Sequence, residues 1–374
     1  MLTFTDEQLR YRIALSAIKG MNRLLAETLI SLTGDVSAFF TLSQRELAEL
    51  TGWDSRLFSE VERGKALMMA GEEVAFVRRK GITPLFFTDA DYPQRLLECD
   101  DAPLMLYYKG CATLQAPRVV SIVGTRHATP YGKNFVETLV HDIAGACPDT
   151  LIVSGLAYGI DVAAHRAALR YGLPTVGVLA HGLNTIYPAQ HRNTAIQMLE
   201  SGGLLTEYAS SQATHKGFFL ARNRIVAGVA DAVVVVESGV KGGSLFTATI
   251  AGDYHRDVFA LPGRVGDISS MGCNELIRNN KASLLTSADD LIEAMGWASR
   301  RQQPTQASLS AQNNVELTAE EQRIMQYLTT QGEGQINRMA VELNTPIATL
   351  SATLVELEFK GCVIALPGGV YRPV

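Results

Sequence analysis

Residues 118–135, RVVSIVGTRHATPYGKNF, combine residue types that could bind an anion. The run 118–123 is apolar and β-branched, and Thr129-Pro130 has the form of a helix N-cap followed by a proline in the first turn. A helix that starts after a strand binds anions because its free N–H groups and its dipole point the same way. The turn between them reads Gly124-Thr125-Arg126 and lacks the Gly-x-Gly-x-x-Gly of a dinucleotide loop. We therefore expect Arg126 to offer its guanidinium fork to a phosphate.

A second segment, residues 215–228 (HKGFFLARNRIVAG), combines cations with aromatic rings. No acidic residue stands between Glu207 and Asp231. Cations that follow phosphates, together with rings that stack on bases, are typical of proteins that bind single-stranded nucleic acid. The alternative is that both phenylalanines belong to the core, and we expect this of one of them. The candidate residues of this segment are Lys216, Phe218, Phe219, Arg222, Asn223 and Arg224.

The loop SGLAYGIDVAAH contains small residues, Ser154, Gly155 and Ala157, which would let a backbone or a base approach closely. Asp161 and His165 follow four residues apart and share a helix face, so a general acid/base pair is conceivable. A carboxylate at a helix start and its i,i+4 neighbour explain the same residues without chemistry, and we favour that interpretation.

A fourth loop, ESGVKGGSLFTATIAG, places Gly242 and Gly243 before Ser244. We expect Ser244 to be the N-cap of a second helix whose N-terminus is open to an anion. A similar Gly-Gly-Ser/Thr turn occurs in Rossmann proteins that process nucleotides, so this loop alone does not choose between DNA and a nucleotide. We find no catalytic nucleophile motif and no clustered histidines, and we predict no catalytic residue, no metal and no cofactor.

The composition is that of a water-soluble globular protein, with 374 residues, 47% hydrophobic and 19% charged. A net charge of −5 means that any nucleic-acid binding must come from a local patch. The N-terminal sequence has early acids and no long apolar core, so we expect neither a signal peptide nor a membrane span. The cysteines are scattered and odd in number, which favours a reducing, cytoplasmic location over disulfides or zinc. They are Cys99, Cys111, Cys147, Cys273 and Cys362.

Three folded parts are expected around these loops. Residues 1–80 are rich in helix formers, and AIKGMNRLLAETLISLTG resembles a helix-hairpin-helix with a turn at Gly20; we favour a packing role over DNA contact. Residues 81–297 include a lead-in segment with strand-like 84–87 and 104–108. Residues 298–316 read as a flexible linker, and 317–374 show three helical periods and a short hairpin, the winged-helix pattern.

The fold class follows from the alternation within 118–297. Strand-like runs occur at 118–123, 150–153, 174–180, 204–206, 231–236, 257–261 and 283–286, mostly separated by amphipathic helical stretches. That rhythm predicts βαβ units and an α/β fold, an extended Rossmann-like parallel sheet covered on both faces. The candidate loops follow strands, and ligands of such sheets bind at the carboxyl ends of the strands.

Taken in order, GTR, SGLAYGID, GLNTIYPAQHR, FFLARNRI, ESGVKGGSLFTA, FALPG and GCNELI resemble the DNA-processing protein A family, also called DprA or Smf. The resemblance implies a non-enzymatic protein that binds and protects single-stranded DNA, forms a homodimer through its Rossmann domain and helps load the recombinase RecA in natural transformation. It also implies a DNA pocket shaped in part by the Gly-Gly-Ser turn. Carried over by motif, the pocket residues are Arg126, Lys216, Phe219, Arg222 and Asn223.

Two departures from the family pattern matter. The stretch before Arg-Asn-Arg reads Phe218-Phe219-Leu220-Ala221 without the frequent proline, so which phenylalanine faces DNA stays open. The expected recognition helix of the winged helix, IATLSATLVELEFK, has no arginine and carries Glu356 and Glu358, which would repel phosphate. We therefore expect the winged helix to serve protein contact or autoregulation.

The main alternative is a nucleotide-processing Rossmann enzyme of the phosphoribohydrolase type, in which Glu237 or Asp161 would be catalytic. The basic, aromatic segment 215–224 argues against it, because a small nucleotide does not require such a segment. A dehydrogenase using NAD is disfavoured by the missing glycine fingerprint.

Overall fold

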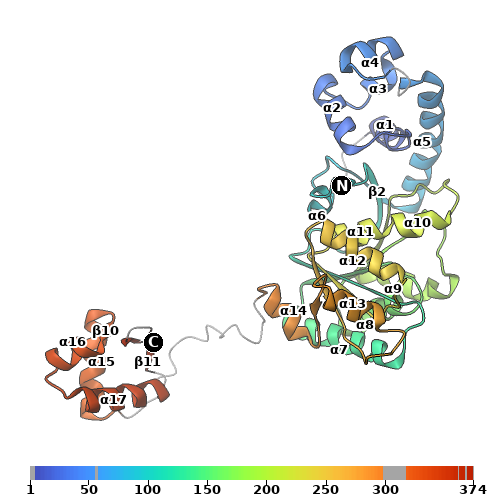
Figure 1. The fold of residues 1–374 in the computed structure, drawn as a ribbon. Coiled ribbons are helices and arrows are strands. Elements are labelled where there is room, and N and C mark those ends of the chain that lie inside the picture. The colour runs from blue at the N-terminus through green and yellow to red at the C-terminus, as the bar shows by residue number, and fades with distance from the viewer. Residues whose placement is uncertain (1–4, 55–57, 298–316, 361, 367–368, 374) are drawn as a thin grey trace. The chain divides into compact units, whose positions relative to one another are not determined.

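The computed structural model describes residues 5–54, 58–297, 317–360, 362–366 and 369–373 (Figure 1). The chain divides into two compact units, Met1–Gln303 and Pro304–Val374. The linker expected at 298–316 lies outside the described residues.

The described part of the first unit begins with five helices, of which α1, α2 and α4 have side-chain N-caps. Thr5 forms a capping box with Gln8 before α1. Gly20, at φ 87°, makes the turn between α1 and α2, and Gly34, also left-handed, ends α2. The turn geometry expected of the hairpin is therefore present. The five helices are α1 Asp6–Ser16, α2 Arg23–Thr33, α3 Ala38–Thr41, α4 Gln44–Thr51 and α5 Glu60–Lys80.

Nine strands of the described residues form one sheet, in the order β1-β2-β6-β5-β4-β3-β7-β8-β9. The lead-in segment supplies β1 and β2, which pair antiparallel at one edge, and the pairs from β6 to β9 are all parallel. The Rossmann-like prediction is confirmed. The strands are β1 Thr83–Phe86, β2 Met105–Gly110, β3 Arg118–Gly124, β4 Thr150–Ser154, β5 Thr175–Val178, β6 Gly203–Thr206, β7 Ala232–Val236, β8 Asp257–Ala260 and β9 Ser283–Leu284.

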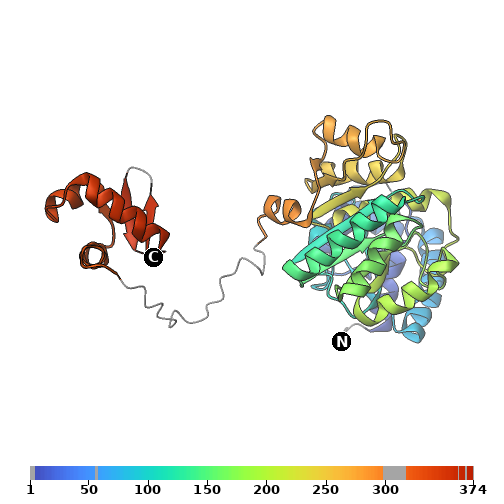
Figure 2. The same cartoon turned by 90° about the horizontal axis from the view of Figure 1, so that it is seen from below.

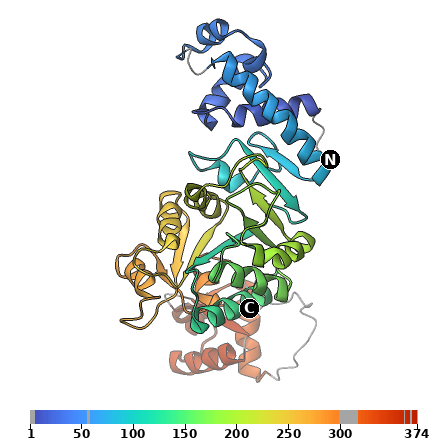
Figure 3. The same ribbon diagram turned by 90° about the vertical axis from the view of Figure 1, so that its right-hand side faces the viewer.

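Helices cover both faces of this sheet (Figures 2 and 3). Alternate residues of β3 face opposite cores: Val120 and Ile122 belong to the core that includes residues of α7, α8 and α14, whereas Val119 belongs to the core that includes residues of α11. The valines of β7 are fully buried, as a central parallel strand requires. The helices are α6 Gln94–Leu97, α7 Pro130–Ala146, α8 Ile160–Tyr171, α9 Arg192–Ser201, α10 Lys216–Ala221, α11 Asn223–Gly228, α12 Gly243–Asp253, α13 Met271–Arg278, α14 Ala288–Ala294 and the short 3-10 turn Ala189–His191.

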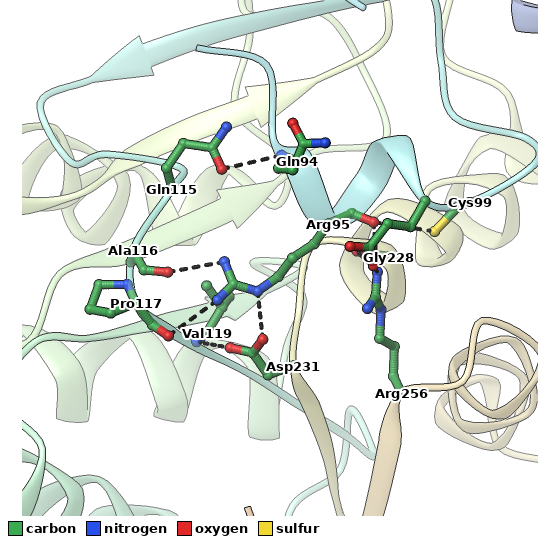
Figure 4. Close-up of polar contacts among 11 residues, drawn as sticks. Gln94, Arg95, Cys99, Gln115, Ala116, Pro117, Val119, Gly228, Asp231 and Arg256 are labelled. Atoms are coloured by element: carbon green, nitrogen blue, oxygen red, sulfur yellow. Dashed lines mark hydrogen bonds and ion pairs between the residues drawn. The ribbon is translucent and has the colours of Figure 1, made fainter. Parts of the chain in front are cut away.

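A polar network joins the lead-in segment to the parallel sheet (Figure 4). Arg95 of α6 forms an ion pair with Asp231 at 2.6 Å and donates to the carbonyls of Ala116 and Pro117. The other oxygen of Asp231 accepts from the Val119 N–H at the start of β3, at 2.8 Å. The same aspartate therefore fixes both the lead-in segment and the first parallel strand.

The described residues of the second unit form three helices and a three-stranded antiparallel sheet in the order β10-β12-β11, which is the winged-helix arrangement. Thr318 and Glu321 form a capping box at the start of its first helix. Leu328, Leu350 and Leu354 lie in its buried core. Its elements are α15 Ala319–Gln331, β10 Gly334–Gln335, α16 Ile336–Glu342, α17 Ile347–Phe359, β11 Val363–Leu366 and β12 Val370–Pro373.

Candidate nucleic-acid interface

A cavity of about 350 Å³ lies where β3 and β7 end, the point at which the strand order reverses. Open α/β sheets bind their ligands at this switch point because the loops there diverge to opposite faces. The tertiary structure thus brings residues from four sequence segments to one place. The sequence-predicted residues that line the cavity are Gly124, Thr125, Arg126, Ala157, Phe219, Arg222, Asn223, Gly242, Gly243 and Ser244.

Arg126 lies exposed on the loop between β3 and α7. Its guanidinium carbon lies 5.8 Å from the centre of the Phe219 ring. Among the described residues, Arg126 forms no ion pair with an acidic side chain. Its charge is therefore available to an anion in the cavity.

The N-terminus of α7, expected to be an open anion site, is filled by the protein itself. Thr129 caps the helix and Pro130 opens it, as predicted. However, the Glu237 carboxylate accepts from the Thr129 N–H at 2.8 Å and from the Thr129 hydroxyl. The Thr125 N–H donates to the Glu237 carbonyl at 2.8 Å, and Glu237 is 1% exposed with φ 55°. The buried carboxylate takes the place that a phosphate would occupy. Glu237 thus holds both ends of the loop that carries Arg126, Thr129 through its carboxylate and Thr125 through its main-chain carbonyl.

The helix that does open toward the cavity is α12. Its cap residue is Gly242, with no side-chain hydrogen bond at the cap, and the helix begins at Gly243. Ser244 was expected to be the cap but lies inside the first turn, and its hydroxyl donates to that of Ser238 at 2.9 Å. Because no side chain of the described residues caps α12, its first N–H groups are free to bind an anion.

Arg222 lines the cavity but is 5% exposed and committed to the protein. It donates to the carbonyls of Gly155 (2.6 Å) and Val178, at the ends of β4 and β5. Burial lowers the pKa of its guanidinium, and the nearby Asp161 opposes that shift. A side chain on Gly155 would collide with the Arg222 guanidinium, so the small residue accommodates this arginine.

The two neighbouring phenylalanines face different surroundings. Phe218 stacks on Tyr208 with ring centres 4.2 Å apart and an interplanar angle of 18°. Phe219 lines the cavity and meets Tyr187 edge-on at 5.7 Å. Tyr187 is 54% exposed, and its residue type and local spacing did not mark it as a candidate. Tyr187 lies within the GLNTIYPAQHR motif, and this motif is the sequence feature that could have identified it as a site residue.

Other predicted residues do not line the cavity. Arg224 forms an ion pair with Glu207 and donates to the Asp101 carbonyl at 2.9 Å. Ser154 is buried and donates to the Ile122 carbonyl at 2.6 Å. Lys216 is exposed at the start of α10, three residues before Phe219, and is not among the residues that line the cavity.

Asp161 and His165 do not form an acid/base pair. The Asp161 carboxylate accepts from the N–H groups of Gly155 (3.2 Å) and Ala157 (3.3 Å), and burial raises its pKa. His165 is fully buried with Nδ1 2.7 Å from the Thr175 hydroxyl, and burial lowers its pKa to about 3. The two side chains therefore have separate partners: His165 is enclosed in the core, whereas Asp161 also lines the cavity.

The hairpin turn of the N-terminal helices lies against other parts of the protein. Met21, Asn22 and Arg23 line a cavity together with Asp100, Asp101, Glu207 and Arg224. Arg224 forms ion pairs with Glu207 and Asp101 there, so this cavity has acids and cations in contact with each other, which agrees with a packing role for the turn. In the part of the chain that the structure describes, no group of side chains has the makings of a metal site. None of the described helices is long and apolar enough to cross a membrane.

The chain is similar to known proteins over most of its length. The model of the family described as DNA recombination-mediator protein A matches residues 83–296, and that of the DprA winged helix domain matches 308–369. The DNA processing protein DprA of Bacillus subtilis is 34% identical over 72% of this chain and 87% of its own.

Two solved structures are similar. The crystal structure of DNA processing protein A from Streptococcus pneumoniae has a TM-score of 0.66 and 31% identity, covering 78% of this chain and 98% of that one. The DNA processing protein A of Helicobacter pylori, described for its single-stranded DNA binding mode, has a TM-score of 0.52 and 32% identity. It covers 57% of this chain and 95% of the H. pylori chain.

Proposed function

The chain belongs to the DNA-processing protein A (DprA/Smf) family, and from this premise we propose that it binds single-stranded DNA at the cavity between β3 and β7. We propose further that it is not an enzyme, that it protects incoming DNA and that it helps load RecA during natural transformation.

One observation carries the DNA-binding proposal. Arg126, whose charge no acidic side chain of the described residues neutralises, lies over Phe219 at the cavity, and the open N-terminus of α12 lines that cavity too. A cation and a helix N-terminus can bind a phosphate, and an aromatic ring can stack on a base, so this cavity offers partners for both parts of a nucleotide chain. Lys216 and Asn223 stand on the same segment and extend the polar surface.

The alternative, a nucleotide-processing enzyme, needs an acid or base that can reach a substrate. The Glu237 carboxylate is held by Thr129, and that of Asp161 is held by backbone N–H groups. Asp161 lines the cavity, but its Oδ2 accepts from two backbone N–H groups, and Glu237 is bound at the start of α7 rather than in this cavity. These contacts support a binding role for the cavity.

The remaining partners are also proposals. We propose a homodimer through the Rossmann domain because the chain belongs to this family. We propose a cytoplasmic location, with which the free cysteines agree. The winged helix presents Glu356 and Glu358 exposed on α17, which supports protein contact or autoregulation over duplex recognition.

The test is fluorescence anisotropy with labelled oligo-dT, matched duplex and mononucleotides across a salt series. We expect the wild type to prefer oligo-dT and Arg126→Ala to weaken that binding, with a salt slope smaller by about 0.7 for the lost phosphate contact. Arg126→Lys should fall between them, because it keeps the charge and loses the planar fork. Lys80→Ala, which removes an exposed cation at the end of α5, is the control. Saturable mononucleotide binding without binding of oligo-dT would refute the proposal.

A further inference from the structure

One buried carboxylate of the helical N-terminal region binds the loop that leads into α10. This loop matters for the proposed DNA-binding groove, by which we mean the cavity that Arg126 and Phe219 line. Glu73 of α5 is 3% exposed although its type is seldom found inside proteins. Both of its oxygens accept from the Ser210 N–H, at 3.0 and 2.9 Å, and one accepts from the Ser210 hydroxyl at 2.6 Å. A desolvated carboxylate needs its hydrogen bonds, so α5 and the loop at Ser210 are held together strongly.

The loop held by Glu73 leads directly into the segment that carries Phe219. It runs from the end of β6 at Thr206 to the start of α10 at Lys216. Within it, Tyr208 stacks on Phe218, the residue beside Phe219. The position of α10, and hence of the Phe219 ring, therefore depends on where this loop lies.

Tyr187, whose ring meets that of Phe219 edge-on, lies on a loop that packs against the same segment. A side chain on Gly182 would lie 2.6 Å from the Ala209 carbonyl oxygen and 2.8 Å from the Ser210 Cα, so the two backbones are in close contact. His181 accepts the Tyr187 N–H on Nε2 at 3.2 Å, which leaves its Nδ1–H to donate to the Gly182 carbonyl at 2.9 Å. The loop that carries Tyr187 thus also packs on Ser210.

We propose that Glu73 is a positioning residue of the DNA-binding groove: by holding Ser210, it sets the distance between Phe219 on α10 and Tyr187 on the loop 181–188. The inference rests on the proposed function. It gives the N-terminal helical region a role in DNA binding without any contact to DNA.

The first test compares Glu73→Ala with Glu72→Ala by oligo-dT anisotropy, with thermal unfolding recorded for each variant. Glu72 is the neighbouring carboxylate on α5 and is exposed, so it is a matched control. We expect Glu73→Ala to weaken oligo-dT binding about tenfold and Glu72→Ala to leave it unchanged. Glu73→Gln, which keeps an acceptor oxygen for Ser210, should recover part of the affinity. A folded Glu73→Ala variant with wild-type affinity would overturn the inference.

A double-mutant cycle separates positioning from general destabilisation. If Glu73 acts by placing Phe219, Glu73→Ala should cost far less affinity in a Phe219→Ala background than in the wild type. Equal losses in both backgrounds would contradict the inference. Should Glu73→Ala fail to fold, Ser210→Ala removes one hydrogen bond only and enters the same cycle.

Amide hydrogen exchange without DNA keeps this inference distinguishable from the proposed function. We expect faster exchange over residues 209–219 and 182–187 in Glu73→Ala than in Glu72→Ala. If the wild type does not bind oligo-dT, the DNA-binding proposal fails whatever the exchange shows, and the role of Glu73 in DNA binding falls with it. If the wild type binds and the exchange rates of the two variants agree, only the role of Glu73 is rejected.

Discussion

Phe218 and Phe219 are adjacent, yet they have different surroundings, and we predict that their alanine variants differ. Phe219→Ala should weaken oligo-dT binding by about 1–3 kcal/mol, the usual value of one base stacked on a ring. Phe218→Ala should instead lower the free energy of unfolding by about 1–2 kcal/mol, because its ring stacks on Tyr208. Anisotropy and urea unfolding measure the two effects. The opposite pattern would mean that Phe218 is the ring that faces DNA.

Because His165 is buried, we predict that the free energy of unfolding of the first unit falls at acid pH. The folded protein keeps this imidazole neutral down to a pKa of about 3, whereas in the unfolded chain it takes up a proton near 6.5. The unfolded state therefore binds more protons below pH 6.5, and the stability present above that pH is lost as the pH falls. From pH 7 to pH 5 we expect a loss of about 2 kcal/mol from this group.

Urea unfolding followed by tryptophan fluorescence measures this loss, since Trp53 and Trp297 both belong to the first unit. His165→Gln should be less stable at pH 7 but lose about 2 kcal/mol less than the wild type on acidification. The control is His127→Gln, which removes an exposed imidazole. A wild-type pH profile in His165→Gln would show that His165 is not the responsible group.

At the scale of elements, the end of β7 and the start of α7 are joined by Glu237. Glu237→Gln removes the charge that faces the helix N-terminus, so we expect the free energy of unfolding to fall by about 1–3 kcal/mol. The measurement is urea unfolding at pH 7. Glu137→Gln on α7 breaks a partly exposed ion pair with Arg170 and should cost less than about 1 kcal/mol. Equal losses of unfolding free energy in the two variants would show that the Glu237 cap contributes no more than a partly exposed ion pair.

At the scale of the whole molecule, the proposed DNA-binding cavity and the winged helix belong to separate compact units. A chain ending at Gln303 should therefore keep its oligo-dT affinity within about twofold of the full chain. The full chain should gain no affinity for duplex DNA over the shortened one, because the acidic side chains of α17 repel phosphate. Paired anisotropy titrations check both statements. A large duplex affinity that disappears with the second unit would contradict the protein-contact proposal.

Signals that act within a few residues allowed much of the fold to be predicted from the sequence alone. Thr129 and Pro130 cap α7, Thr318 and Glu321 form a capping box, and the valine run forms the buried strand β7. Capping and strand periodicity depend on neighbours two to four residues away, so they are legible in a linear chain. The order of the candidate loops along parallel strands likewise predicted that they meet at one sheet edge.

The tertiary structure alone decided which charged groups are bound within the protein and which are available to a ligand. Glu237 meets Thr129 across 108 residues of sequence, Arg222 meets Gly155 across 67, and Glu73 meets Ser210 across 137. In the sequence Arg222 and Arg126 are equivalent cations, but the fold desolvates the first and binds it to carbonyls while it leaves the second exposed. Whether a charge serves the fold or a ligand depends on its burial and its distant partners, and residue type and local spacing contain neither.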